Sequence, residues 1–272
     1  MKAASPQLTQ LKSAMKSAWM AGDFGEVAKY TTEEAENFVA RIRIQPGARV
    51  LDVASGTGNT AIPAARGGAE VTGVDIATNL LSQAEKRAQS ENLRAQFREG
   101  DAEHLPFGDR EFDVVLTMYG AMFAPRPDRV AAELVRVCKP GGTIAMANWT
   151  PQGFVGKNFR VTAKHVPPPP GLPAPVLWGD EQVVRQRFGN TVSKLNARCQ
   201  MARFQYPFAP GEVVEFFRRY FGPTQMAFTR LDADGQARLA SELVSLWKEH
   251  NQDSNGGTAV DAEYLEVHAI RA

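Results

Sequence analysis

A short apolar segment that runs directly into a glycine turn constrains the fold of this chain most strongly. Residues 48–54 have the composition of a buried strand, Gly56 and Gly58 follow at once, and a helical pattern begins near Ala61. Glycine lets the backbone turn sharply and approach a ligand closely, because it has no Cβ. In a parallel sheet such a turn lies at the carboxyl end of a strand, where ligand clefts form. The segment therefore predicts an α/β fold with a ligand site beside the turn.

Strands and helices continue to alternate along the chain. Strands separated by helical crossovers indicate a parallel sheet with helices on both faces. We therefore expect a doubly wound, mostly parallel, seven-stranded α/β sheet. Its strands are predicted at residues 48–54, 69–76, 95–101, 112–118, 142–149, 194–208 and 263–272.

Segments on either side of this alternating region have a different character. Residues 1–45 contain two amphipathic helical patterns, which favour core packing but also suit a roof over the ligand cleft. The tract of prolines at 167–170 favours an exposed loop, so residues 151–180 are predicted to be a connector or lid. We expect a single domain, in which residues 46–150 bind the cofactor and residues 151–272 form a substrate cap and the last strands.

Composition excludes several classes of protein. The 31 basic residues balance 30 acidic ones and are interspersed with them, which argues against a nucleic-acid partner. The sequence has no run of about 18 apolar residues, which a membrane-spanning helix would need, so the expected location is the cytoplasm. Cys138 and Cys199 are far apart and belong to no cluster of metal ligands, so we predict no metal site.

Three acidic residues near strand ends indicate which ligand the cleft accepts. Asp52 puts a carboxylate near the turn, where it would repel the pyrophosphate of NAD and suit a cationic amino-acid group better. Asp75 ends the second strand, where it can accept hydrogen bonds from ribose hydroxyls. Asp101 can accept a hydrogen bond from an exocyclic amine, while the Ala102 N–H can meet a ring nitrogen. Together these residues suit an adenosine that carries an amino acid.

Five motifs between about residues 28 and 149 resemble those of a known family: VLDVASGTGN, GVDIA, GDAEHLPF, FDVVLTM and LVRVCKPGG. In this order they are similar to class I S-adenosylmethionine-dependent methyltransferases of the type 11 family, which include enzymes like the ubiquinone and menaquinone C-methyltransferases. The chain departs from that pattern at Ser55, where many members have Cys or Gly, although a small side chain still fits the turn. The resemblance implies a Rossmann-like methyltransferase fold, S-adenosylmethionine as cofactor and S-adenosylhomocysteine as product.

The resemblance also implies roles for particular residues. Asp75 and Ile76 would bind the ribose, and Asp101 and Ala102 the adenine, while Met118 would lie under the adenosine near the sulfonium. Each carboxylate also has a purely structural interpretation, as a helix cap, a solvated strand end or a turn residue. The residues expected around the methionine part are Tyr30, Asp52, Ala54, Gly56, Thr57 and Gly58.

The loop at 119–125 follows the fourth strand, where the ligand edge of the sheet meets the methyl group. Its side chains, with those of the connector, favour a small apolar or aromatic acceptor that reacts by in-line displacement. Packing in the core is the alternative interpretation for each side chain. We assign no catalytic base, although His165 and His250 are within reach of the cleft in principle. The expected acceptor-pocket residues are Tyr119, Met122, Phe123, Trp149 and Trp178.

Other functions fit the sequence less well. DNA and RNA amino-methyltransferases carry an Asn/Asp-Pro-Pro-aromatic motif after strand four, where this chain has residues 118–121, MYGA. A NAD-dependent dehydrogenase would need a hydride-transfer acid that the sequence does not indicate. A methyltransferase acting on a protein, and a non-catalytic sensor that binds S-adenosylmethionine, remain alternatives.

Overall fold

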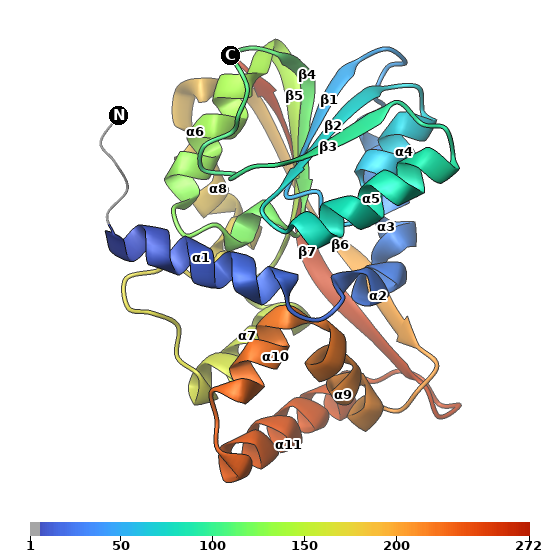
Figure 1. The fold of residues 1–272 in the computed structure, drawn as a ribbon, viewed down its shortest axis with the longest axis vertical. Coiled ribbons are helices and arrows are strands. Elements are labelled where there is room, and N and C mark those ends of the chain that lie inside the picture. The colour runs from blue at the N-terminus through green and yellow to red at the C-terminus, as the bar shows by residue number, and fades with distance from the viewer. Residues whose placement is uncertain (1–5) are drawn as a thin grey trace.

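The predicted strands pair into one sheet in the computed structural model, which describes residues 6–272 (Figure 1). The strand order is β3-β2-β1-β4-β5-β7-β6. Neighbours from β3 to β5 are parallel, whereas β7 runs antiparallel to both β5 and β6. This confirms the mostly parallel, seven-stranded α/β fold. The strands are β1 (Arg49–Val53), β2 (Glu70–Asp75), β3 (Ala95–Glu99), β4 (Phe112–Met118), β5 (Cys138–Trp149), β6 (Val192–Tyr206) and β7 (Thr258–Arg271).

Amphipathic helices cover both faces of the sheet. One face carries α3 (Thr32–Ile42), α4 (Ala61–Arg66) and α5 (Thr78–Ser90), and the other carries α6 (Pro127–Val137) and α8 (Glu181–Phe188) (Figure 1). Apolar residues in these helices recur every three or four positions, so each helix buries one stripe against the strands. In α5 that stripe is Leu80, Leu81, Ala84 and Ala88.

Strands β6 and β7 form a long antiparallel ribbon that extends past the rest of the sheet. Pairing between β5 and β7 stops at Trp149 and Tyr264, but β6 and β7 stay paired as far as Tyr206 and Thr258. Four helices pack around this extension, below the sheet in Figure 1. They form the cap: α7 (Phe154–His165), α9 (Pro210–Tyr220), α10 (Gly222–Thr229) and α11 (Ala233–His250).

Residues 151–180, expected to be a connector or lid, contain more regular structure than the proline tract indicated. This segment begins with the twelve-residue helix α7, which packs on α11, and it contains the short helix η3 (Pro175–Gly179). Only Phe154 and Gly156 of α7 are buried. With so few buried residues, the helix is hard to predict from its apolar pattern. Tertiary contacts supply most of the stability of helices in proteins, and for α7 these include the packing on α11.

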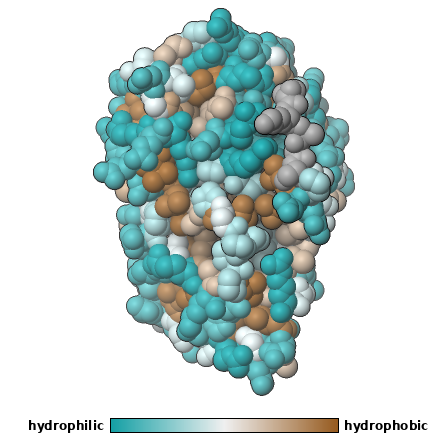
Figure 2. Space-filling model, turned by 90° about the vertical axis from the view of Figure 1, so that its left-hand side faces the viewer, coloured by the Kyte–Doolittle hydropathy of each residue, from teal (hydrophilic) through white to brown (hydrophobic). Residues whose placement is uncertain are grey.

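Helices α1 (Pro6–Met20) and α2 (Phe24–Ala28) lie between the sheet and the cap (Figure 1). The chain after α1 is fixed to the cap where Asp23 N donates to Tyr220 O, 3.0 Å away. Gly222 passes so close to Ala18 O that a Cβ at this position would collide with it. Among residues 6–272, no helix is long and apolar enough to cross a bilayer. On one face of the molecule, apolar patches lie among hydrophilic residues, several of them across its middle (Figure 2).

Candidate active site

A cavity of about 650 Å³ lies where β1, β2, β3 and β4 end. The predicted cofactor residues that line it are Ala54, Gly56, Thr57, Asp75, Ile76, Asp101, Ala102 and Met118. Tyr30, Asp52 and Gly58 do not line it. The cavity joins residues from four strand ends because the carboxyl ends of parallel strands meet at one edge of the sheet.

The glycine turn is held by backbone bonds and by Asp75. Ala54 has φ +58° and Gly56 has φ +52°, so both adopt the left-handed conformation. The Asp75 carboxylate accepts from Gly56 N at 2.9 Å and from Ala77 N at 2.8 Å. Burial raises the pKa of Asp75, while these backbone hydrogen bonds oppose the rise. Each carboxylate oxygen keeps a further lone pair, which a ligand hydroxyl can use.

Asp52 lies behind the turn instead of facing the cavity. It is fully buried, and its Oδ2 accepts from Thr60 Oγ1 at 2.6 Å, next to the start of α4. Its Oδ1 has no hydrogen-bond partner among the residues that the structure describes. Burial raises the pKa of Asp52 to about 7; the Thr60 hydrogen bond opposes this shift, and the nearby Asp75 charge adds to it. The carboxylate therefore connects β1 to α4.

Tyr30 and Gly58 also have packing positions. The centroid of the Tyr30 ring lies 4.4 Å from that of Tyr206, and the rings of Phe208 and Phe216 complete the cluster. A Cβ at Gly58 would lie 3.3 Å from side-chain atoms of Ala84 and Ile62, so this glycine allows close contact with the helices. Both residues support the walls of the site from outside the cavity.

Helix α1 closes the end of the cavity beside Asp101. Lys12 Nζ lies 2.5 Å from Asp101 Oδ2 and 2.5 Å from Glu103 Oε2, and Lys16 lies 2.5 Å from Glu99. Asp101 also accepts from Glu103 N at 2.9 Å. Lys12 and Lys16 are site residues that no sequence motif indicated. Their spacing of four places them on one face of a helix, which was the only available signal.

Tyr119 and Gly120 form the opposite wall, directly after β4. Tyr119 has φ +58°, and its ring stacks on Trp149 with centroids 3.7 Å apart. A Cβ at Gly120 would lie 2.6 Å from both the Cβ and the O of Ala54, so the ends of β1 and β4 approach closely here. The Tyr119 hydroxyl is buried without a hydrogen-bond partner among the described residues, and burial raises its pKa.

A second cavity, about 170 Å³, opens beside the first and lies between the sheet and the cap. Twelve of its lining residues are aromatic, and within residues 6–272 no Asp, Glu, Lys, Arg or His contributes to the lining. We call it the aromatic chamber. Five residues line both cavities: Trp19, Phe24, Thr31, Tyr119 and Phe123.

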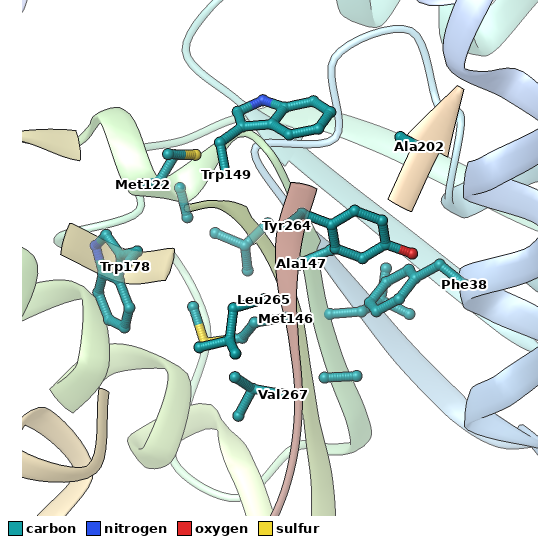
Figure 3. Close-up of a cluster of buried hydrophobic side chains, with 14 of the residues drawn as sticks. Phe38, Met122, Met146, Ala147, Trp149, Trp178, Ala202, Tyr264, Leu265 and Val267 are labelled. Carbon is teal, nitrogen blue, oxygen red and sulfur yellow. The ribbon is translucent and has the colours of Figure 1, made fainter. Parts of the chain in front are cut away.

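Three of the five predicted acceptor residues, Tyr119, Phe123 and Trp149, line the aromatic chamber. Met122 and Trp178 do not, because they are buried in the core on the opposite side of β7 from Tyr264 (Figure 3). Sequence reasoning missed the chamber residues that the cap supplies, since they are scattered along the sequence. They include Phe159, Phe204, Tyr206, Phe217, Phe221 and Trp247.

The four histidines line neither of these two cavities. His165 Nε2 is 3.1 Å from a Glu242 oxygen, and His250 Nε2 is 2.9 Å from Lys157 Nζ. His104 bridges to Asp101 through the backbone, and His268 lies 3.0 Å from Glu266 on β7. None of them is therefore placed as a base for a ligand in the aromatic chamber.

Comparisons with known proteins agree with this geometry. A family model described as a methyltransferase domain matches residues 51–146. An uncharacterized protein of Mycobacterium tuberculosis is 39% identical over 236 residues, which cover 85% of this chain and 86% of that protein. A demethylmenaquinone methyltransferase of Renibacterium salmoninarum is 38% identical over 109 residues, 40% of this chain and 44% of that one.

A similar fold occurs in a solved structure of a phosphoethanolamine N-methyltransferase from Haemonchus contortus, in complex with phosphomonomethylethanolamine and S-adenosylhomocysteine. The TM-score is 0.56 at 19% identity, and the match covers 88% of this chain and 52% of that one. At this identity the likeness concerns the fold.

Proposed function

The chain belongs to the class I S-adenosylmethionine-dependent methyltransferases of the type 11 family, and on that premise we propose that it methylates a small apolar or aromatic acceptor held in the aromatic chamber. S-adenosylmethionine is its cofactor and supplies a methyl group that its sulfonium charge activates towards a nucleophile. The observation that carries the proposal is that the chamber and the larger cavity share five lining residues.

The larger cavity has groups that fit the cofactor. Asp75 and Ile76 would bind the ribose, Asp101 and Ala102 the adenine, and Met118 would pack under the adenosine. Residues 54–57 would surround the methionine part. The glycine turn supports this assignment, because its left-handed backbone brings N–H and C=O groups to the cavity without side chains in the way. Tyr30, Asp52 and Gly58 would act indirectly, by fixing the turn and the walls.

The size and lining of the chamber favour an acceptor with about one ring. An apolar cavity of roughly 150 Å³ stays dry and binds benzene, and the chamber is of similar volume. A dry pocket that holds the nucleophile in line with the methyl group can supply about 7–11 kcal/mol of the barrier reduction. Aromatic faces also suit a cationic amine.

The polar groups of the chamber favour nucleophiles that need little help to lose a proton. Among the described side chains they are three indole N–H donors, the hydroxyls of three threonines, one asparagine amide and two tyrosines. Burial raises the pKa of both tyrosines, Tyr119 and Tyr206, so neither is a base near neutral pH. A thiol, an amine or an electron-rich carbon therefore fits better than an alcohol, which usually needs a base.

The overall arrangement favours a small molecule over a nucleic acid. The chamber lies between the sheet and the cap, and the described part of its lining carries none of the basic side chains that phosphates require. We propose that residues 1–45 cover the cofactor cleft, residues 46–150 bind the cofactor, and residues 151–272 complete the same domain as cap and final strands.

Binding and turnover together test the proposal. Calorimetric titrations with S-adenosylmethionine, S-adenosylhomocysteine and NAD should show binding of the first two only. A screen of monocyclic thiols, amines, phenols and quinols should then yield S-adenosylhomocysteine with at least one acceptor. Cofactor binding without turnover on any small, protein or nucleic-acid acceptor would instead favour a sensor, and binding of NAD alone would refute the family's cofactor for this chain.

A pair of variants tests the chamber. Phe159→Ala removes a chamber wall whose ring lies 5.9 Å from that of Phe123, and it should raise the KM for the acceptor about tenfold while leaving the cofactor Kd unchanged. Phe208→Ala is the control, because Phe208 is also partly buried among aromatic rings but lies outside both cavities. Equal effects of the two changes on KM would refute the placement of the acceptor.

A further inference from the structure

A third cavity of about 520 Å³, which we call the polar groove, lies between α3 and the strands β6 and β7. Among residues 6–272 it shares no lining residue with the aromatic chamber or with the 650 Å³ cavity, which we call the cofactor cavity. In the register of the ribbon, Asn196 faces His268 and Arg198 faces Glu266, so alternate residues of two paired strands form its floor. Its lining residues are Asn37, Ala40, Arg41, Arg43, Asn196, Arg198, Gln200, Glu266 and His268.

The charges in the polar groove are unbalanced, because the described residues that line it include three arginines and one acidic residue. Arg41 already has partners: its guanidinium lies 2.7 Å from Glu34 and 2.8 Å from Glu266, and it donates to the Tyr264 hydroxyl at 2.7 Å. Its charge is therefore neutralised within the protein.

Glu266 is fully engaged as well. It is 6% exposed and also lies 3.0 Å from His268 Nε2. Burial by itself would raise the pKa of Glu266, but His268 and Arg41 hold it below the usual value. This carboxylate is therefore not available to the other two arginines.

Arg43 and Arg198 have no ion pair or side-chain hydrogen bond in the part of the chain that the structure describes. Both are exposed, so water hydrates them, but two like charges that share one groove repel each other. Arg43 also ends α3 with φ 57°, a left-handed position that usually holds Gly or Asn. An arginine at this position thus carries a backbone cost, caused by its Cβ, that a glycine would avoid.

We propose that the polar groove is a second ligand site, which binds a small molecule through a phosphate or carboxylate group held by Arg43 and Arg198. A guanidinium presents a planar set of donors that matches two oxygens of such a group. The amides of Asn196 and Gln200 line the same groove and can donate further hydrogen bonds. An anion here would neutralise the unpaired charge that the protein itself leaves.

Titration of the full chain with inorganic phosphate, and separately with succinate, tests this site. Ionic strength is kept constant with chloride. The parent should bind at least one of the two anions in a saturable, one-site manner, and the anion that binds more tightly distinguishes phosphate from carboxylate as the group recognised. Arg198→Gln should weaken that binding roughly tenfold or more, as loss of a charged hydrogen-bonding pair does.

Two further variants make the result specific. Arg43→Asn should weaken anion binding similarly, because asparagine tolerates the left-handed backbone but removes the charge. Arg230→Gln is the matched control: Arg230 is exposed and lies outside all three cavities, so its loss should leave anion binding unchanged. Unchanged S-adenosylmethionine binding in every variant shows that the fold is intact.

The proposal is overturned if neither anion binds saturably to the parent, or if Arg198→Gln binds as the parent does. An equal loss in Arg230→Gln would also overturn it, because the effect would then reflect net charge. These outcomes are independent of methyl transfer, because anion binding is measured without an acceptor and the substituted residues line neither the cofactor cavity nor the aromatic chamber.

Discussion

At the scale of single residues, the site is built on strained backbone where β1 and β4 end. Ala54 and Tyr119 both adopt left-handed conformations, which cost a residue with a Cβ about 1–2 kcal/mol each. Both line the cofactor cavity, and Gly120 follows Tyr119 in contact with Ala54. Strain of this kind persists only where the surrounding structure enforces it, and it gathers at functional sites.

Gly120→Ala should therefore damage the cofactor site. The new Cβ would lie 2.6 Å from the O of Ala54, and backbone cannot yield as a flexible side chain can. We expect S-adenosylmethionine affinity to fall at least about tenfold and stability to fall by about 1–3 kcal/mol, measured by calorimetry and urea unfolding. Gly211→Ala, where a Cβ meets nothing within 4 Å, is the control. Parent-like affinity in Gly120→Ala would show that the contact between the two strand ends is not needed.

Asp52 should make stability depend on pH. Its pKa is raised from 3.8 to about 7 in the folded chain, so the native state holds a proton that the unfolded state releases between these values. The contribution of this group is therefore most favourable at low pH and is lost as pH rises towards 7. Asp52→Asn cannot ionise, yet its amide oxygen can still accept from Thr60 Oγ1.

Between pH 5 and pH 8, the free energy of unfolding of the parent should fall by about 2–3 kcal/mol relative to that of Asp52→Asn. The figure follows from about 1.4 kcal/mol per pKa unit. Urea unfolding at the two pH values measures this. Parallel pH profiles for the two proteins would contradict the raised pKa. Because Asp52 lies behind the turn, cofactor affinity should change little; a large loss would mean that the carboxylate contacts the methionine part.

At the scale of elements, α1 lies between the two halves of the molecule, and its Trp19 side chain contacts both. The Trp19 ring lies 5.0 Å from Phe123 of the sheet side and 5.6 Å from Phe221 beside the cap, and it lines both cavities. Helix α1 also packs on α10 near Gly222 and forms ion pairs through Lys12 and Lys16. The Lys16–Glu99 pair is exposed and contributes little, so we expect the buried aromatic contacts of Trp19 to be a major part of what holds the helix.

Trp19→Ala should loosen α1 without unfolding the sheet. Each aromatic pair contributes about 0.5–1.5 kcal/mol, so the loss should weaken S-adenosylmethionine binding about tenfold and speed tryptic cleavage after Lys12 and Lys16. Met20→Ala changes the next residue of the same helix, which is 38% exposed, and should behave like the parent. If Trp19→Ala is cleaved no faster than Met20→Ala, the other contacts of α1 are sufficient to hold it.

At the scale of the whole molecule, the β6–β7 ribbon makes the sheet and the cap one cooperative unit. The same two strands pair with β5 at one end and carry the cap helices at the other, and apolar residues of both parts belong to one core. Far-UV circular dichroism and tryptophan fluorescence should therefore give coincident urea transitions. Two separate transitions would show that the cap unfolds by itself.

The local pattern of the sequence determined the sheet and the cofactor. Alternating strands and helices, the glycine turn at 56–58 and carboxylates at strand ends are signals within a few residues of one another, and eight of the eleven expected cofactor residues line one cavity. Asp52 shows what such local signals cannot predict. The sequence placed it four residues before Gly56, but only the structure showed that its side chain is buried behind the turn.

Only the tertiary structure decided the aromatic chamber and the polar groove. The chamber brings together side chains from Trp19 to Trp247, and the groove joins α3 to strands that follow it by more than 150 residues. Met122 and Trp178 had the composition of acceptor residues but face the core on the other side of β7. The physical reason is that packing between distant elements, not local periodicity, selects which apolar side chains surround a cavity and which fill the core.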